Sequence, residues 1–222
     1  MFGRRKFRGI VEKLAASSRH TVVLGPTGSG KTTFSQWFLR YLHSNFIVFD
    51  YDGEYSGLGV RVKPKVPFGS WVEDLAVALR PSSGGVEITA AVYEAFRGST
   101  SSWEEFVEKL ERNISLRRFW RGSEAALSRL LPLMYAGVLT DREVVLPPRC
   151  VIDLSGLNEE KKVLCVLLML TWLFSTTRSP RPVRTFVVVE EFKAALVGDQ
   201  VTPVVVPFLC LLYTSPSPRD RG

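Results

Sequence analysis

Apolar residues along this chain follow two periods, which separate predicted helices from predicted strands. Helical spacing of apolar positions marks a basic amphipathic segment near the start and further helices at about 31–42 and 163–174. Short apolar runs predict strands at 21–24, 46–50, 150–154 and 186–189. The last of these is a continuous β-branched run, the kind typical of a strand buried on both faces. Pro64 and Pro67 interrupt 60–68, which is therefore predicted to be a loop or at most an edge strand.

A long helical pattern, from about 89 to 137, lies between the second and third predicted strands. Ser102 and Glu105 form a capping-box pattern, Ser123 is a candidate cap of the next helix, and Gly137 stands where a helix would end. The order strand, helix, strand, insertion, strand, helix, strand predicts an α/β fold with a mostly parallel sheet and helices on both faces. The predicted domain covers 1–209, with a helical insertion at about 86–146.

Composition narrows the class of protein without naming a function. The chain has 222 residues, 45% of them hydrophobic and 23% charged, which suits one globular domain. Its net charge of +7 favours a polyanionic partner such as nucleic acid. Three cysteines, Cys150, Cys165 and Cys210, show neither metal-site spacing nor an even disulfide set, which fits a reducing compartment. The longest apolar run is too short to span a bilayer and no targeting peptide is evident, so a cytoplasmic location with no membrane partner is predicted.

The C-terminal run CLLYTSPSPRD, at 210–220, resembles the translation of a sequencing-library adaptor. This resemblance predicts that 210–222 is a non-native tail and that the domain is incomplete at its C-terminal end. A natural Ser/Pro-rich tail is the alternative. On the first interpretation, residues 1–222 alone are expected to hydrolyse substrate weakly or not at all.

The run GPTGSGKT, at 25–32, matches the phosphate-binding pattern G-x-x-x-x-G-K-[ST] and lies between a predicted strand and a predicted helix. Glycines let the backbone curl around a phosphate, and the loop amides and helix N-terminus supply positive partial charge. Lys31 is expected to contact the β- and γ-phosphates of ATP, and the Thr32 hydroxyl to coordinate Mg²⁺. The predicted nucleotide-binding residues of this loop are Gly25, Pro26, Thr27, Gly28, Ser29, Gly30, Lys31, Thr32 and Thr33.

Two acids follow the last predicted strand. Carboxylates at the C-terminal end of such a strand lie where α/β sheets bind ligands. Glu190 is the candidate Mg²⁺ partner, together with Thr32, although aspartate is commoner at this position. Glu191 is the candidate general base that orients the attacking water. Two exposed acids at a strand end are the structural alternative.

Three further motifs, in order along the chain, carry a family resemblance. They are DYDGEY at 50–55, CVIDLSGL at 150–157 followed by NEE at 158–160, and VEE at 189–191. With the phosphate loop, they resemble the HerA/FtsK family of P-loop ATPases. The resemblance implies a RecA-like fold of the additional-strand, catalytic-glutamate type, ATP and Mg²⁺ as ligands, a hexameric ring and translocation of double-stranded DNA. It also implies that Asp50 and Glu54 lie near the nucleotide, the alternative being a surface acidic turn.

Other functions stay open at this point. The phosphate loop begins too early for the β-barrel domain of the cellular helicases, so a viral or plasmid ATPase for genome packaging or conjugation is an alternative. Partner nucleases, virion proteins or conjugation proteins would then be possible partners. A nucleotide-gated binding protein with little turnover is an alternative of another class. Candidate DNA contacts are Arg117, Arg118 and Arg121 beside Phe119 and Trp120, although these residues would equally suit a solvated helix face.

Overall fold

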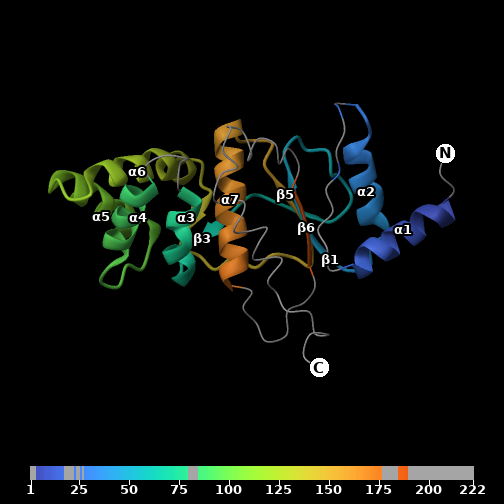
Figure 1. The fold of residues 1–222 in the computed structure, drawn as a ribbon, viewed down its shortest axis with the longest axis horizontal. Helices are drawn as coiled ribbons and strands as arrows, with labels where there is room; N and C mark the ends of the chain where they lie inside the picture. The colour runs from blue at the N-terminus through green and yellow to red at the C-terminus, as the bar shows by residue number, and fades with distance from the viewer. Residues whose placement is uncertain are drawn as a thin grey trace, which may run out of the picture.

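The computed structural model describes residues 4–17, 23, 26, 28–79, 85–176 and 185–189. Except for Val23, the predicted strand at 21–24 lies outside these ranges, as do Gly25, Thr27 and the whole of 190–222. The molecule is elongated, with helix α1 (Arg4–Ala16) near one end and a group of helices at the other (Figure 1).

The main sheet has four parallel strands in the order β2-β5-β1-β6. These are β1 (Asn45–Asp50), β2 (Val60–Val62), β5 (Arg149–Asp153) and β6 (Thr185–Val189). Three of them confirm predicted strands to within one residue, and β2 is the edge strand that the prolines of 60–68 allowed. The described part of the fold is therefore a mixed α/β arrangement with a parallel sheet, consistent with a P-loop NTPase.

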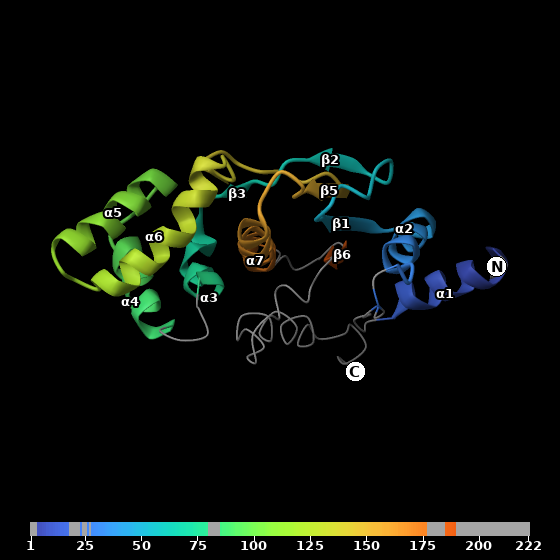
Figure 2. The same cartoon turned by 90° about the horizontal axis from the view of Figure 1, so that it is seen from above.

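Helices cover both faces of this sheet, as predicted. Phe46 and Val48 of β1 pack with Leu39 of α2 (Lys31–Tyr41) in one cluster. Ile47 and Phe49 face the other way, into a cluster that includes α7 (Glu159–Thr176). The alternation follows the two-residue period of a strand. Figure 2 shows the sheet between α7 and α2.

The prediction that 186–189 is buried on both faces is wrong for the described part of the chain. Val187 is 38% exposed, and none of the five residues of β6 is fully buried. The physical reason is position, since among the described strands β6 pairs with β1 alone and forms the outer edge of the sheet. An uninterrupted β-branched run favours a strand, but it does not show how many neighbours cover that strand.

The helical insertion begins earlier than the sequence pattern predicts. A 3-10 turn (Ser70–Asp74) and the short α3 (Leu75–Leu79) precede α4 (Gly85–Phe96), α5 (Trp103–Ser115) and α6 (Trp120–Tyr135). A two-stranded parallel pair of β3 (Val66–Pro67) and β4 (Leu139–Thr140) joins the entry of the insertion to its exit. This pair explains how a long excursion returns to the point where it left the sheet.

The predicted helix ends are confirmed at two positions and wrong at one. The Ser102 hydroxyl accepts from the amide of Glu105 at 3.1 Å, and Gly137, in the left-handed region, follows the end of α6. The Glu105 carboxylate accepts from the Ser101 amide, one residue earlier than a capping box requires. Ser123 is not a cap but a fully buried residue inside α6, which begins at Trp120.

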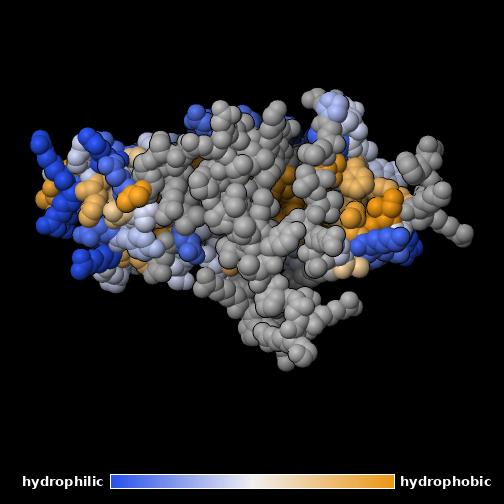
Figure 3. Space-filling view, in the orientation of Figure 1, coloured by the Kyte–Doolittle hydropathy of each residue, from blue (hydrophilic) through white to orange (hydrophobic). Residues whose placement is uncertain are grey.

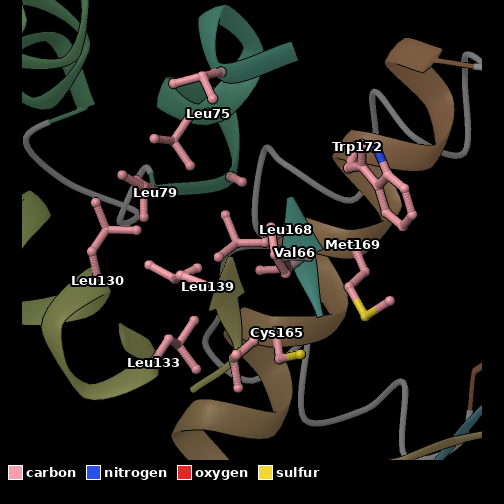
Figure 4. Packing of buried hydrophobic residues seen from close by; sticks show 14 of the residues in the cluster. Val66, Leu75, Leu79, Leu130, Leu133, Leu139, Cys165, Leu168, Met169 and Trp172 are labelled. Atoms are coloured by element: carbon pink, nitrogen blue, oxygen red, sulfur yellow. The ribbon is translucent and has the colours of Figure 1, made fainter. Parts of the chain in front are cut away.

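A single hydrophobic cluster joins the insertion to the sheet. Side chains from α3, α6, α7 and the β3–β4 pair converge in it (Figure 4), including Leu75, Leu133, Leu139 and Leu168. Because α7 packs against the sheet on one side and the insertion on the other, the two parts share one core. Cys150 and Cys165 are unbonded and buried in this core, and burial raises the pKa of their thiols to about 11 and about 12.

Within the described ranges no helix is long and apolar enough to cross a membrane. The same ranges contain no group of three or more His, Cys, Asp or Glu side chains placed to hold a metal ion.

Candidate nucleotide site

The glycine-rich loop leads into α2, as its pattern predicts. Gly30 is the N-cap of α2 in the left-handed conformation, with φ of 86°, which a residue with a side chain rarely adopts. The ammonium of Lys31 donates to the carbonyl oxygen of Pro26 at 3.0 Å, so the lysine lies against its own loop. Thr32 and Thr33 follow in the first turn of the helix. This turn presents backbone amides, an ammonium and hydroxyl groups together, which suits a phosphate group.

Arg149, which sequence analysis did not single out, fixes the direction of α2. Its guanidinium donates to the carbonyl oxygens of Leu42 at 2.8 Å and Leu39 at 3.0 Å, and it lies 4.6 Å from the centre of the Phe46 ring. Arg149 opens β5, so the C-terminal end of α2 is held at the amino edge of the sheet. The N-terminus of α2, with its positive partial charge, therefore points toward the carboxyl edge. In the sequence, the one sign of this role is a single arginine directly before an apolar strand.

The Asp50 carboxylate organises the acidic turn that follows β1. This carboxylate is fully buried, and it accepts from the amides of Gly53 and Glu54 at 2.9 Å and of Tyr55 at 3.2 Å. Asp50 therefore holds the turn together. The backbone carbonyl of Glu54 accepts from Gln36 of α2 at 2.9 Å, and the Glu54 side chain is exposed. The turn thus packs on the helix that begins at the phosphate loop, which brings these two predicted site motifs side by side.

A cluster of opposite charges occupies the carboxyl ends of β1 and β5. Asp50 and Asp153 are register partners on these strands, and Arg61 bridges them at 3.3 Å and 3.1 Å. Lys63 adds a second cation to Asp153 at 3.0 Å, and the Ser155 hydroxyl donates to the same carboxylate at 2.6 Å. The hydrogen bond from Arg61 is the main reason why the pKa of Asp153 lies well below its usual range, and it raises the pKa of Arg61.

Lys162 links α7 to the acidic turn through ion pairs. Its side chain is only 7% exposed, and its ammonium lies 2.8 Å from Glu159 and 3.5 Å from Asp52. Glu159 is the main cause that raises the pKa of Lys162, and the ammonium lies 5.5 Å from the centre of the Tyr51 ring. Sequence analysis assigned no role to Arg61, Lys63 or Lys162, and it named Asp153 only within the motif at 150–157, because charge pairs between distant segments leave no local pattern.

The replacement Asp153→Asn is expected to lower the free energy of unfolding by about 1–3 kcal/mol near neutral pH, because it leaves Arg61 and Lys63 without their shared carboxylate. The folded-state pKa of Asp153 is depressed below the unfolded value of about 3.9, so its stabilisation is present above that pH and is lost as pH falls through the folded pKa.

Urea unfolding between pH 7 and pH 2 tests this expectation. The difference between the wild-type protein and Asp153→Asn should be largest above pH 5 and shrink on acidification. Glu108→Gln, at an exposed position of α5, is the control and should stay within about 0.5 kcal/mol of the wild type. A constant difference at every pH would contradict a charged role for Asp153.

The described residues end directly before the second half of the predicted site. Glu190 and Glu191 lie outside the described residues, but β6 runs to Val189, whose register partner is Phe49 of β1. The carboxyl ends of β1, β5 and β6 therefore lie at one edge of the sheet, the edge toward which the N-terminus of α2 points. The structure places part of the phosphate loop, the acidic turn and the end of β6 at a common edge.

Comparison with known families supports a P-loop ATPase. Residues 11–118 match a family model described as Helicase HerA, central domain. The match extends from within α1 through the phosphate loop and the acidic turn to residue 118, just past the end of α5. No curated protein and no solved structure matches the chain. The family match supports a HerA-like P-loop ATPase family, suggests an ATPase motor of the HerA/FtsK type and implies ATPase activity in general.

Proposed function

We propose that this protein is the motor core of an ATP-driven machine that translocates or remodels double-stranded DNA. The observation that carries the proposal is the glycine-rich loop at the head of α2, held beside the acidic turn through Gln36, inside a segment that matches the HerA central domain. The net charge of +7 supports a polyanionic partner.

Each predicted site residue has a role in this proposal. The loop residues Gly25 to Gly30 and the first turn of α2 bind the phosphates of ATP, and Lys31 neutralises their charge. The left-handed Gly30 and the donor groups around it fit a Mg²⁺–ATP ligand. When bound, Mg²⁺ would neutralise phosphate charge, with the Thr32 hydroxyl and the Glu190 carboxylate as its protein partners.

Glu191 would act as the base that orients a water toward the γ-phosphate. The hydrogen bonds of Asp50 favour a positioning role, because its oxygens hold the acidic turn. Glu54 is then the member of that turn whose exposed carboxylate is available near the nucleotide.

A ring, most simply a hexamer, is the proposed assembly, as in the family that the motifs resemble. In such a head-to-tail ring each site is completed by its neighbour, often through an arginine finger. The location in the cytoplasm and the nuclease, virion or conjugation partners remain predictions from sequence.

Glu191→Gln is expected to keep Mg·ATP affinity within about threefold of wild type while lowering turnover by at least about a hundredfold, because the amide retains the shape but not the basicity of the carboxylate. Equilibrium binding of a fluorescent ATP analogue and release of phosphate measure the two effects separately. Glu190→Gln is the comparison, since loss of a Mg²⁺ partner should weaken binding as well. Unchanged turnover in Glu191→Gln would remove Glu191 as the base.

The proposal as a whole is tested by ATP hydrolysis with and without long linear duplex DNA, at about 50 mM and 200 mM salt. A DNA motor should be stimulated by duplex DNA, and the stimulation should fall at the higher salt because phosphate contacts release counterions. Hydrolysis indifferent to DNA would instead favour an ATPase that acts on protein. Tight ATP binding without turnover at either salt would favour the second candidate, a nucleotide-gated binding protein.

A further inference from the structure

The turn between α5 and α6, residues 116–121, forms a projecting end of the molecule, which we call the arginine tip. It lies at the end of the insertion remote from the sheet and from α1 in both ribbon views (Figures 1 and 2). All six residues of the tip are exposed. Figure 3 shows hydrophilic and hydrophobic side chains next to each other at this end of the molecule.

The charge of the tip has one sign. The six residues of the tip include three arginines, Arg117, Arg118 and Arg121, and no acidic residue, and the nearest acids along the chain are Glu111 and Glu124. Arginine is the residue best suited to phosphate groups, because its planar fork binds two oxygens at once. An exposed cluster of guanidinium groups with no acidic residue inside it is complementary to a polyanion rather than to a surface of mixed charge.

The backbone of the tip adopts a conformation that is unfavourable for residues with large side chains. The amide of Arg118 donates to the carbonyl of Asn113 at 2.8 Å and that of Arg117 to Ile114 at 3.0 Å, the bonds of a helix end that normally has glycine in the left-handed position. Here that position holds Arg117, with φ of 54°. Phe119, with φ of 47°, is also left-handed. Two strained residues with large side chains point to a functional surface.

Large apolar side chains share this surface with the arginines. Leu116 is 56% exposed, Phe119 47% and Trp120 42%. The guanidinium of Arg121 lies 5.2 Å from the centre of the Trp120 ring, a cation–π arrangement that holds both groups. Exposed aromatic rings among phosphate-binding cations are how proteins hold unpaired bases, since each base can stack on a ring while the cations follow the backbone. A closed duplex offers no base face to such rings.

We infer that the arginine tip is a binding site for single-stranded nucleic acid, in which the arginines contact phosphates and Trp120 and Phe119 stack on bases. This site goes beyond the proposed nucleotide site and needs no ATP for its contacts. A motor on duplex DNA meets unpaired strands at ends and forks, so the two functions are compatible, but neither requires the other.

The test is fluorescence anisotropy with a labelled oligothymidylate of about 20 nucleotides and a labelled duplex of the same length, using the full chain. The wild-type protein should bind the single strand several-fold more tightly than the duplex. Trp120→Ala should weaken single-strand binding about tenfold, whereas Trp120→Phe should retain most of it because a ring remains. Tyr135→Ala, at an aromatic residue 84% exposed at the other end of the same helix, is the control and should change nothing.

The double replacement Arg117→Ala with Arg118→Ala should weaken binding and make the slope of log affinity against log salt shallower by about 1.4, or roughly 0.7 for each lost phosphate contact. Arg142→Ala, at an exposed arginine outside the tip, should leave the slope unchanged. Arg117→Gly separates function from folding, because it should raise the melting temperature while it weakens binding.

Single-strand binding that is absent, or is unaffected by all the tip variants, would overturn the inference. So would tighter binding to duplex that Trp120→Ala does not alter, which would make the tip a duplex contact instead. ATP affinity, measured on the same variants, should stay at the wild-type value. A failure of the tip is thereby distinguished from a failure of the proposed ATPase.

Discussion

Lys31→Ala is expected to weaken Mg·ATP binding by at least about thirtyfold. Truncating one partner of a desolvated, hydrogen-bonded charge pair costs about 2–5 kcal/mol, and every 1.4 kcal/mol corresponds to about a factor of ten in affinity. The fold should survive, because Lys31 is in the first turn of α2 and its ammonium donates to the loop carbonyl of Pro26. The melting temperature without nucleotide should therefore change by no more than a few degrees.

Isothermal titration with ATP and Mg²⁺ measures the affinity, and the nucleotide-induced rise in melting temperature gives a second estimate. Lys13→Ala, at an exposed lysine in the last turn of α1, is the matched control and should bind ATP as the wild type does. Lys31→Arg tests geometry, since it keeps the charge but replaces a compact ammonium with a planar fork. Wild-type affinity in Lys31→Ala would mean that the loop does not bind the phosphates.

The elements that sequence analysis predicted well are those with a local cause. The strand at β1, the strand at β5 and the helix α7 follow from apolar runs, and the Ser102 cap and the Gly137 stop follow from single residues with strong conformational preferences. The glycine turn that leads into α2 belongs with them, because a helix N-terminus after such a turn needs only neighbouring residues.

What sequence analysis missed depends on contacts between distant segments. Arg149 caps α2 from more than a hundred positions away, and Arg61 joins the ends of two strands. A contact between distant segments leaves no periodic pattern of residues in the sequence. The Ser123 prediction failed for a related reason. The helix starts at Trp120 without any side-chain cap, and tertiary packing of α6 against α4 overrides the local preference of serine for a helix start.

The same α4–α6 packing makes Gly122 the glycine, among those that the structure describes, at which one added methyl group should cost most stability. A Cβ built on Gly122 would lie 2.1 Å from the carbonyl oxygen of Glu87 and 2.9 Å from the amide nitrogen of Ile88. Both atoms belong to the backbone of α4, so no side-chain rotation can make room. Gly122→Ala should therefore force the two helices apart and lower the free energy of unfolding by about 3 kcal/mol.

Helix propensity acts in the opposite direction and is the smaller effect, since alanine is favoured over glycine inside a helix by about 1 kcal/mol. Gly9→Ala isolates that smaller effect, because a Cβ on Gly9 of α1 meets no atom within 4 Å. Urea unfolding should thus show opposite shifts in midpoint for the two replacements, downward for Gly122→Ala and upward for Gly9→Ala. An unchanged midpoint for Gly122→Ala would mean that α4 and α6 are not in backbone contact. Because α6 begins at Trp120, their separation should also move the arginine tip, so Gly122→Ala is expected to weaken single-strand binding without touching any tip residue.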